Sequence, residues 1–402
     1  MKPKFILLLS FLTLLTSCMD FDDATQPISV KVQVQMPDAL KGADVSGHNI
    51  IMNLGGQTIS AKTEADGVAS FKDIVPDVYD ISTSWKMSPY EYVKLTGEKL
   101  EEWEYKYNFS ISANKSSQIL TKEGEQLTLN AKVSHDQPIL ISKVYYAGSK
   151  DNNNKNYLAG KYIELYNNSD EDYDASGLYI ALMESESTIA YTPGQVMDTI
   201  FAKQVFRIPA DKAFIVEPGG SVLIVNSAID HSGQGPNERN LLSADFEAKD
   251  KQGKTTNNPN VPELQLVYST YSLISQLNMV QSGPCSVIIF STSEDVLNWP
   301  TAYAYGKTKG SLFMKIPTSS VIDGVDILAK KAQTGVDVNT KRLFDYIDAG
   351  YTNINATSGY NGEVVYRKIE STATDGRKIL KDTNNSQNDF DVTTDINPRE
   401  YK

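Results

Sequence analysis

Cysteine is almost absent from this chain of 402 residues, which has only Cys18 and Cys285. Two cysteines cannot supply the several bridges of a disulfide framework. With 40% hydrophobic residues, the chain can instead bury a substantial core. Cys285 comes just before an apolar run, residues 287–290, that is typical of a buried strand. We therefore expect Cys285 to be a small buried hydrophobic residue and not a nucleophile.

Histidine is also scarce, and no two of His48, His135 and His231 stand at a metal-ligand spacing. This excludes a zinc centre of several imidazoles, and we expect no metal and no cofactor. Asp230 and His231 are the best titrating pair. Because two adjacent side chains cannot both point at one ion without further ligands, we interpret them as a capped loop with an exposed histidine.

One acidic stretch superficially resembles a calcium loop. Residues 151–156 are rich in Asp and Asn, but they lack the central glycine and the closing glutamate of an EF-hand. We predict a hairpin tip there.

Basic residues are outnumbered, with 38 Lys and Arg against 50 Asp and Glu, which gives a net charge of -12. They are scattered singly, so nucleic acid is excluded as an expected partner. The sequence also lacks a Gly-x-Ser-x-Gly motif and a defensible cysteine–histidine arrangement. Its paired carboxylates, such as Glu184 and Glu186, are typical of solvated surfaces. We therefore expect a protein that is not an enzyme.

Long hydrophobic runs are missing except for residues 5–15, which are too few to span a bilayer as a finished helix. With Lys2 and Lys4 before it, this run predicts a secretory signal peptide over residues 1–17. The next residues, Leu-Thr-Ser-Cys, resemble a bacterial lipobox and end at Cys18. The resemblance implies that Cys18 is acylated and anchors the protein in a membrane. An ordinary secreted protein with a chance cysteine is the alternative.

A short acidic segment follows the lipobox, and residues 18–26 are predicted to form a solvated tether. Its carboxylates are Asp20, Asp22 and Asp23. In Bacteroidota, acidic residues at this place resemble the signal that sends lipoproteins to the outer face of the outer membrane. The implied localisation is the outer membrane, lipid-anchored and facing the cell surface. A plain acidic linker is the alternative.

Apolar residues alternate with polar ones from Ile28 through Val34, the period of two of a β-strand. Further short strands and turns follow, so residues 27–136 are predicted to form a small antiparallel β-sandwich. The segments TEADGVASF and IVPDVYDIS resemble the prealbumin-like modules of carboxypeptidase regulatory domains and Gram-positive pilin repeats. In those families the module is a spacer or interaction domain.

Aromatic residues gather toward the end of this first module. Residues 103–111 alternate large apolar and polar side chains, which predicts a strand with one packed face. Trp85 and Tyr90 precede this segment. Trp85, Tyr90 and Trp103 are therefore candidate ligand residues on a platform that could stack against sugar rings. A plain sandwich core is the favoured alternative.

The second module is organised around residues 161–182. Residues 162, 164 and 166 point to one face of the predicted strand and residues 163 and 165 to the other, and both sets have large side chains. Both faces of the strand are therefore expected to pack. An Asn- and Asp-rich turn follows. We expect Glu164 to be structural by accepting backbone or hydroxyl donors, and Asn167 by fixing the turn.

Several stretches resemble the successive strands of a lamin-tail domain: ILISKVYYAGS, YIELYNNSDEDYDASGLYI, IPADKAFIVEPGGSVLIVNSA, SSVIDGVDIL, and YRKI with DTNNSQNDF. That family is an immunoglobulin-like β-sandwich, which the resemblance implies for residues 137–402. Residues 222–225 are expected to be a fully buried strand, and Phe390 to close a polar loop. The predicted fold class is all-β, with two β-sandwich modules in tandem: prealbumin/carboxypeptidase-regulatory-like, then lamin-tail-like with loop insertions.

Residues 227–263 depart from the lamin-tail pattern as an insertion. They contain two loop signals, with a short helix predicted over residues 241–247 between them. Long insertions in compact β domains often carry function, so Asp230 and His231 are further candidate ligand residues.

The whole mature chain resembles an uncharacterised lipoprotein family of Bacteroides relatives that joins these two modules. Its members are generally found alongside outer-membrane transport systems. The resemblance implies a non-catalytic ligand-binding or accessory component of a nutrient-uptake system, with a TonB-dependent transporter as partner and an unknown ligand. An adhesin or structural envelope protein is the main alternative, and an accessory domain of a secreted hydrolase system is a weaker one.

Overall fold

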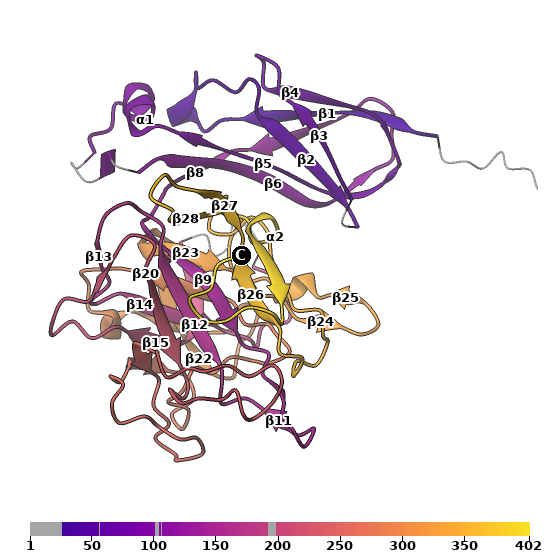
Figure 1. Ribbon diagram of the computed structural model, residues 1–402. Coiled ribbons are helices and arrows are strands. Elements are labelled where there is room, and N and C mark those ends of the chain that lie inside the picture. The colour runs from indigo at the N-terminus through magenta and orange to yellow at the C-terminus, as the bar shows by residue number, and fades with distance from the viewer. Residues whose placement is uncertain (1–25, 56, 101–103, 106, 192–197) are drawn as a thin grey trace, which may run out of the picture.

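The computed structural model describes residues 26–402 except 56, 101–103, 106 and 192–197, and this part of the chain is nearly all β. It forms two β-sandwich modules in tandem, which confirms the predicted fold class (Figure 1). The sheets of the first module end with His135, and those of the second begin at Ile139. Within the described ranges, no helix is long and apolar enough to cross a membrane.

The first module packs a sheet of three strands on a sheet of five. In spatial order, the strands are β4 (Val68–Ile74), β1 (Ile28–Gln35) and β7 (Glu125–Asn130), then β3 (Gln57–Lys62), β2 (Asn49–Leu54), β5 (Asp77–Met87), β6 (Phe109–Leu120) and β8 (Lys132–His135). As the alternation predicts, Val30, Val32 and Val34 are buried in the shared core. A short 3-10 turn, η2 (Asp38–Leu40), follows β1.

The expected aromatic strand is wrong in its first half. Glu104 and Tyr105 lie in a helical turn, and β6 begins only at Phe109. Before them, α1 (Pro89–Thr96) interrupts the strand pattern. This helix has strong local signals that outweigh the alternation, because Ser88 accepts a hydrogen bond from the backbone of Glu91 and a proline follows at the first helical position.

The second module also contains two packed sheets. One has, in order, β18 (Phe246–Glu247), β17 (Ser221–Val225), β12 (Tyr162–Asn167), β9 (Ile139–Tyr145), β26 (Val364–Arg367) and β29 (Phe390–Thr393). The other has β21 (Thr301–Tyr303), β22 (Leu312–Pro317), β15 (Thr199–Arg207), β14 (Tyr179–Met183), β20 (Val287–Phe290) and β23 (Val321–Val325), with β19 (Gln265–Ser269) paired to β15.

Smaller elements decorate these sheets. Four two-stranded ribbons are β10 (Ser149–Lys150) with β11 (Asn156–Tyr157), β13 (Tyr173–Asp174) with β16 (Ile215–Val216), β24 (Lys330–Lys331) with β25 (Gly335–Val336), and β27 (Ile369–Thr372) with β28 (Lys378–Leu380). The short helices are η4 (Val296–Asn298), η5 (Thr318–Ser320), η6 (Val338–Thr340) and α2 (Ser386–Asp389). The β10–β11 ribbon confirms the predicted hairpin tip.

β12 is buried along its whole length, so the prediction that both of its faces pack is confirmed. Ile163 and Leu165 belong to the core between the two sheets. Tyr162 belongs to a separate apolar cluster on the outer side of the first of these sheets. The neighbouring β17 is buried over residues 222–225, also as predicted.

The polar residues of β12 have the contacts expected of structural residues. Glu164 accepts hydrogen bonds from Lys143 Nζ at 2.9 Å, from the backbone N–H of Arg399 at 2.9 Å, and from the hydroxyl of Tyr401. The Asn167 amide donates to the carbonyl of Glu171 in the following turn at 2.7 Å and to the carbonyl of Val216 in β16 at 2.8 Å, and its oxygen accepts from Ser169.

The insertion of residues 227–263 is a folded cover on the outer side of this sheet. Glu247 is fully buried and accepts from the backbone N–H groups of Ala228 and Asn258. The helix predicted over residues 241–247 is wrong. Asp245 donates its N–H to the carbonyl of Leu223, and Phe246 pairs in parallel with β17. This segment is extended because the open edge of the sheet offers its backbone hydrogen-bond partners, which a short helix could not use.

Phe390 is buried, as predicted. The polar loop before it contains a short helix, α2, in place of the continuous loop that the sequence predicts.

Candidate ligand-binding junction

Three adjoining cavities lie between the two modules. Their volumes are about 340, 390 and 330 Å³. The first two share Tyr346 in their walls, and the last two share Asp136, Gln137 and Asp382. Each cavity is lined by residues of both modules, and together they form one junction crevice. One wall is the five-stranded sheet of the first module. The facing wall is formed by residues 318–323 and 344–347, by the β27–β28 ribbon and by the loop that follows it.

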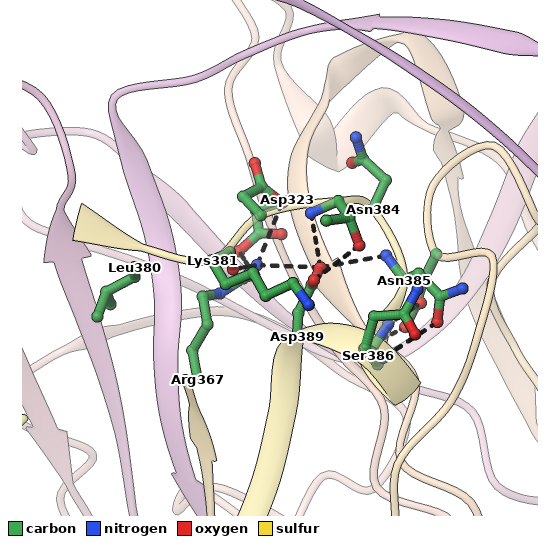
Figure 2. A network of polar contacts seen from close by, with 12 residues as sticks. Asp323, Arg367, Leu380, Lys381, Asn384, Asn385, Ser386 and Asp389 are labelled. Atoms are coloured by element: carbon green, nitrogen blue, oxygen red, sulfur yellow. Dashed lines mark hydrogen bonds and ion pairs between the residues drawn. The ribbon is translucent and has the colours of Figure 1, made fainter. Parts of the chain in front are cut away.

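Direct hydrogen bonds hold these walls in place. Asn384 Nδ2 donates to Ser134 Oγ of β8 at 2.8 Å, and the Asn114 amide of β6 donates to the carbonyl of Ala349. Figure 2 shows Asn384 and Asn385 in the loop between β28 and α2. The Asn385 side chain accepts from two backbone N–H groups of α2, which fixes the loop at the start of that helix.

Arg367, at the end of β26, is the buried centre of the network behind this wall (Figure 2). Its guanidinium lies 2.7 Å from Asp323 Oδ2, 3.1 Å from Asp382 Oδ1 and 3.7 Å from Asp389 Oδ2. It also donates to the carbonyl of Ile141 at 2.9 Å. One cation thus joins strands of both sheets to the loop that lines the crevice.

Three carboxylates around a single guanidinium cannot all be charged without mutual repulsion. Burial raises the pKa of Asp323 to about 6, with Arg367 opposing this rise and Asp382 adding to it. The same influences raise the pKa of Asp389 to about 7. The cluster therefore binds protons in a range where ordinary carboxyl groups are ionised.

A second ion pair forms the facing wall. Lys86 Nζ lies 2.9 Å from Asp136 Oδ2 and donates to Ser110 Oγ at 2.7 Å. Burial works to lower the pKa of Lys86, but Asp382 and Asp136 outweigh it and raise the pKa. Burial raises the pKa of Asp136, and Asp382 adds to that rise. Asp382 thus acts electrostatically on both walls.

The junction crevice can therefore hold a small polar ligand by hydrogen bonds. Its walls present carboxylates at Asp136 and Asp382, the amide of Gln137, the guanidinium of Arg377 and the phenol of Tyr107. Cavities of this size accept molecules of a few sugar or amino-acid units. Among the described residues, no group of three or more His, Cys, Asp and Glu is arranged to hold a metal ion.

The aromatic candidates of the first module make separate contacts. Trp85 is half-buried and stacks on His48 with ring centroids 4.1 Å apart. Tyr90 is 71% exposed on α1 and lies 5.2 Å from the ring of Tyr105. Trp103 falls outside the described residues. The two described members of the set are thus held by different partners.

Asp230 and His231 are neighbours in sequence but point to different surroundings. Asp230 accepts from the backbone and hydroxyl of Ser232 at 2.9 and 2.6 Å, which is the expected loop cap. The predicted exposure of His231 is wrong, because its exposed fraction is 0%. Its ring nitrogens lie 2.6 Å from the Tyr157 hydroxyl and 2.8 Å from the Ser227 carbonyl, so burial leaves neither nitrogen unsatisfied.

The remaining predicted residues lie partly inside and partly outside the described part of the chain. Cys285 is buried, as predicted, and burial raises the pKa of its thiol to about 11. Cys18, Asp20, Asp22 and Asp23 lie outside the described residues, so lipidation and surface export stay predictions.

Sequence reasoning missed the junction entirely. One signal was present, since Arg367 ends a short strand that begins with the apolar residues Val364 and Val365. A cation in such a strand indicates a buried anionic partner. The identity of that partner could not be read from the sequence, because Asp323 lies 44 residues away.

These features define a class of protein: an all-β protein of two tandem β-sandwich modules with a polar crevice between them. The sequence profile of a family described as "Protein of unknown function (DUF4876)" matches residues 217–396. The crystal structure of a DUF4876 family protein from Bacteroides thetaiotaomicron VPI-5482 has 21% sequence identity and a TM-score of 0.56, and the alignment covers 91% of this chain and 95% of that chain. The overall fold is therefore shared over nearly the full length.

Two further solved structures show only remote likeness. Fervidolysin from Fervidobacterium pennivorans, a keratinolytic enzyme related to subtilisin, is 14% identical with a TM-score of 0.19 over 52% of this chain and 26% of its own. A putative cell adhesion protein from Bacteroides eggerthii is 8% identical with a TM-score of 0.17 over 60% of this chain and 95% of its own. Neither likeness indicates a shared overall fold. No curated protein matches the sequence.

Proposed function

We propose that this protein is a lipoprotein of the outer membrane that faces the cell surface and binds a small polar ligand, as a non-catalytic component of a nutrient-uptake system. Cys18 carries the lipid anchor and the acidic residues after it direct surface export, with a TonB-dependent transporter as the partner. The observation that carries the binding role is the junction crevice, since its three cavities are walled by polar side chains from two modules.

The crevice suits binding because its walls are already fixed. Asn384 bonds the loop before α2 to β8, Arg367 joins the two sheets of the second module, and Lys86 pairs with Asp136 in the first module. Because these contacts need no ligand, little ordering entropy is lost when a ligand enters. The polar groups in the walls supply donors and acceptors in several directions, which favours hydroxylated or zwitterionic molecules over apolar ones.

A binding role also agrees with the state of Cys285. Its raised thiol pKa makes it a poor nucleophile, and its burial keeps substrates from it.

Ligand binding can be tested by thermal shift with a panel of monosaccharides, oligosaccharides, amino acids and short peptides. A ligand should raise the melting temperature of the wild-type protein and fail to do so for Gln137→Trp, which fills the wall shared by two cavities. The matched control is Gln33→Trp on an exposed position of β1. Equal shifts in both variants would place the ligand elsewhere.

The transport role requires a partner in the membrane. A tagged chain, purified from native outer membranes and analysed by mass spectrometry, should recover a β-barrel transporter. Recovery of no such partner, with normal growth of a deletion strain on every limiting nutrient, would overturn the uptake role. Recovery of cell-wall polymers or adhesive partners would favour an adhesin. Complete protection from an impermeant protease on intact cells would place the protein on the periplasmic side.

A further inference from the structure

Three large apolar side chains are exposed together at one end of the first module. Val75 is 56% exposed, Val78 44% and Ile119 68%. Val78 on β5 stands directly opposite Ile119 on β6, so both side chains project from the same face of the sheet. Val75 lies in the turn between β4 and β5. These three residues are called the apolar edge.

The fold prevents the apolar edge from withdrawing into the core. Tyr79 and Leu120, the next residues along each strand, are buried and occupy the core side. The Tyr79 hydroxyl donates to the carbonyl of Val75 at 2.7 Å, which fixes the turn. Two charged residues close to it in sequence, Asp77 and Lys122, are also exposed. Exposure is therefore built into this end of the sheet.

The apolar edge lies at the end of the module where β1 begins. Ile28 pairs with Ile74 at the end of β4, and Gly124, after β6, donates its N–H to the carbonyl of Ser29 at 2.9 Å. In Figure 1 this is the right-hand end of the first module, and α1 lies at the opposite end. The chain thus enters the first module from the anchor side next to Val75 and Ile119.

The length of the intervening chain limits how far the apolar edge can lie from the membrane. Ten residue steps separate Cys18 from Ile28. Even fully extended, they span at most about 35 Å. A lipid anchor on Cys18 would therefore keep the apolar edge at a high effective concentration near the bilayer, where a small apolar area is sufficient for contact.

We propose that the apolar edge of Val75, Val78 and Ile119 rests on the lipid bilayer to which the protein is anchored. This inference rests on the proposed lipidation of Cys18. Contact would give the anchored protein a fixed orientation, in which the end of the first module where β1 begins faces the lipid and α1 points away from it. A second copy of the chain could cover the same residues, and the experiment separates the two.

The chain is well suited to a fluorescence test, because Cys285 is buried and an acylated Cys18 has no thiol. A single introduced cysteine is therefore the only reactive one in the lipidated protein. Ile119→Cys would be labelled with an environment-sensitive fluorophore, and the full lipidated protein would be reconstituted into phosphatidylethanolamine–phosphatidylglycerol vesicles. Tyr90→Cys is the matched control, since it is equally exposed at the far end of the module.

We expect a blue-shifted emission for the label at position 119 and several-fold stronger quenching by spin-labelled lipids than at position 90. Adding Val75→Asp and Val78→Asp should reduce that quenching several-fold while the melting temperature stays unchanged, because both side chains are exposed.

Equal and weak quenching at both positions, in protein that sediments with the vesicles, would overturn the docking but leave the anchor intact. Protein from native cells that fails to fractionate with membranes would overturn the anchor and the docking together. A blue shift in detergent that grows with protein concentration and is insensitive to lipid quenchers would assign the apolar edge to a dimer and overturn the bilayer contact.

Discussion

Lys143 and Glu164 stand opposite each other on β9 and β12 and form an ion pair 2.9 Å long in which both side chains are buried. Burial lowers the pKa of Lys143, against the attraction of Glu164. The Tyr401 ring lies over the ammonium group, 3.8 Å from Nζ to the ring centroid. The pair therefore depends on contacts from a segment more than two hundred residues away in sequence.

Glu164→Ala should lower the free energy of unfolding by about 3–5 kcal/mol, because it leaves a buried lysine with no counter-charge. Urea unfolding followed by circular dichroism measures this. Glu217→Ala is the control, since Glu217 is exposed and should change stability by less than about 0.5 kcal/mol. A loss of ligand binding at full stability in Glu164→Ala would contradict the structural role.

Asn167→Ala should lower the stability by about 1–3 kcal/mol, because the backbone carbonyls of Glu171 and Val216 lose their donor. Thermal melts should show this fall together with any loss of binding. Asn153→Ala at the exposed hairpin tip is the matched control and should melt like the wild type. An unchanged melting temperature in Asn167→Ala would show that the turn does not need this side chain.

The carboxylates around Arg367 predict a pH dependence of stability. The folded protein holds protons on Asp323 and Asp389 more tightly than the unfolded chain, with pKa values of about 6 and about 7. Their contribution to stability is therefore complete below about pH 4 and is lost as the pH rises through 6 to 7. Asp389→Asn should flatten this part of the curve, because an amide does not titrate.

Urea unfolding at about pH 5 and about pH 7.5 gives the change in the free energy of unfolding between the two pH values, which is then compared between wild type and variant. We expect the wild type to lose at least about 1 kcal/mol more than Asp389→Asn between the two values. Asp391→Asn, at an exposed position, is the control and should follow the wild type. Parallel curves for all three proteins would mean that Asp389 stays ionised.

Cys285 should react with a thiol reagent at about pH 8 at least ~100-fold more slowly in the folded protein than in urea, because its pKa of about 11 and its burial both suppress the thiolate. Absorbance at the wavelength of the released chromophore follows the reaction. A rate in the folded protein close to that of a small peptide thiol would show that Cys285 is accessible, and would reopen a catalytic role.

Much of the fold could be predicted because its signals are local. The alternation after Ile28 and the dense apolar pattern around Ile163 each specify a strand and its buried face within a few residues. α1 was not predicted, although Ser88, Pro89 and Glu91 form a local start signal, because the aromatic residues around this helix also fit a strand pattern. The helix predicted from Leu241 onward was wrong for a different reason, because pairing with the open edge of β17 determines the conformation of this segment.

The candidate site could not be predicted, because it has no local signal. Asp136 ends the first module, while Asp323, Arg367 and Asp382 come from separate segments of the second. Each is an ordinary charged residue in sequence. Their proximity follows only from the pairing of β9 with β26 and from the way the second module packs against the five-stranded sheet.

The pairing of Val144 on β9 with Val365 on β26 has a consequence for biogenesis. When β9 has been synthesised, roughly 220 residues have still to be made before Val365, on the order of 10–45 s at ordinary rates of synthesis. We expect β9, which is apolar and without this neighbour, to need a holding chaperone during that interval. Pulse-labelled cells should therefore show the second module protease-sensitive until translation has passed Val365, and early protection would contradict this order of assembly.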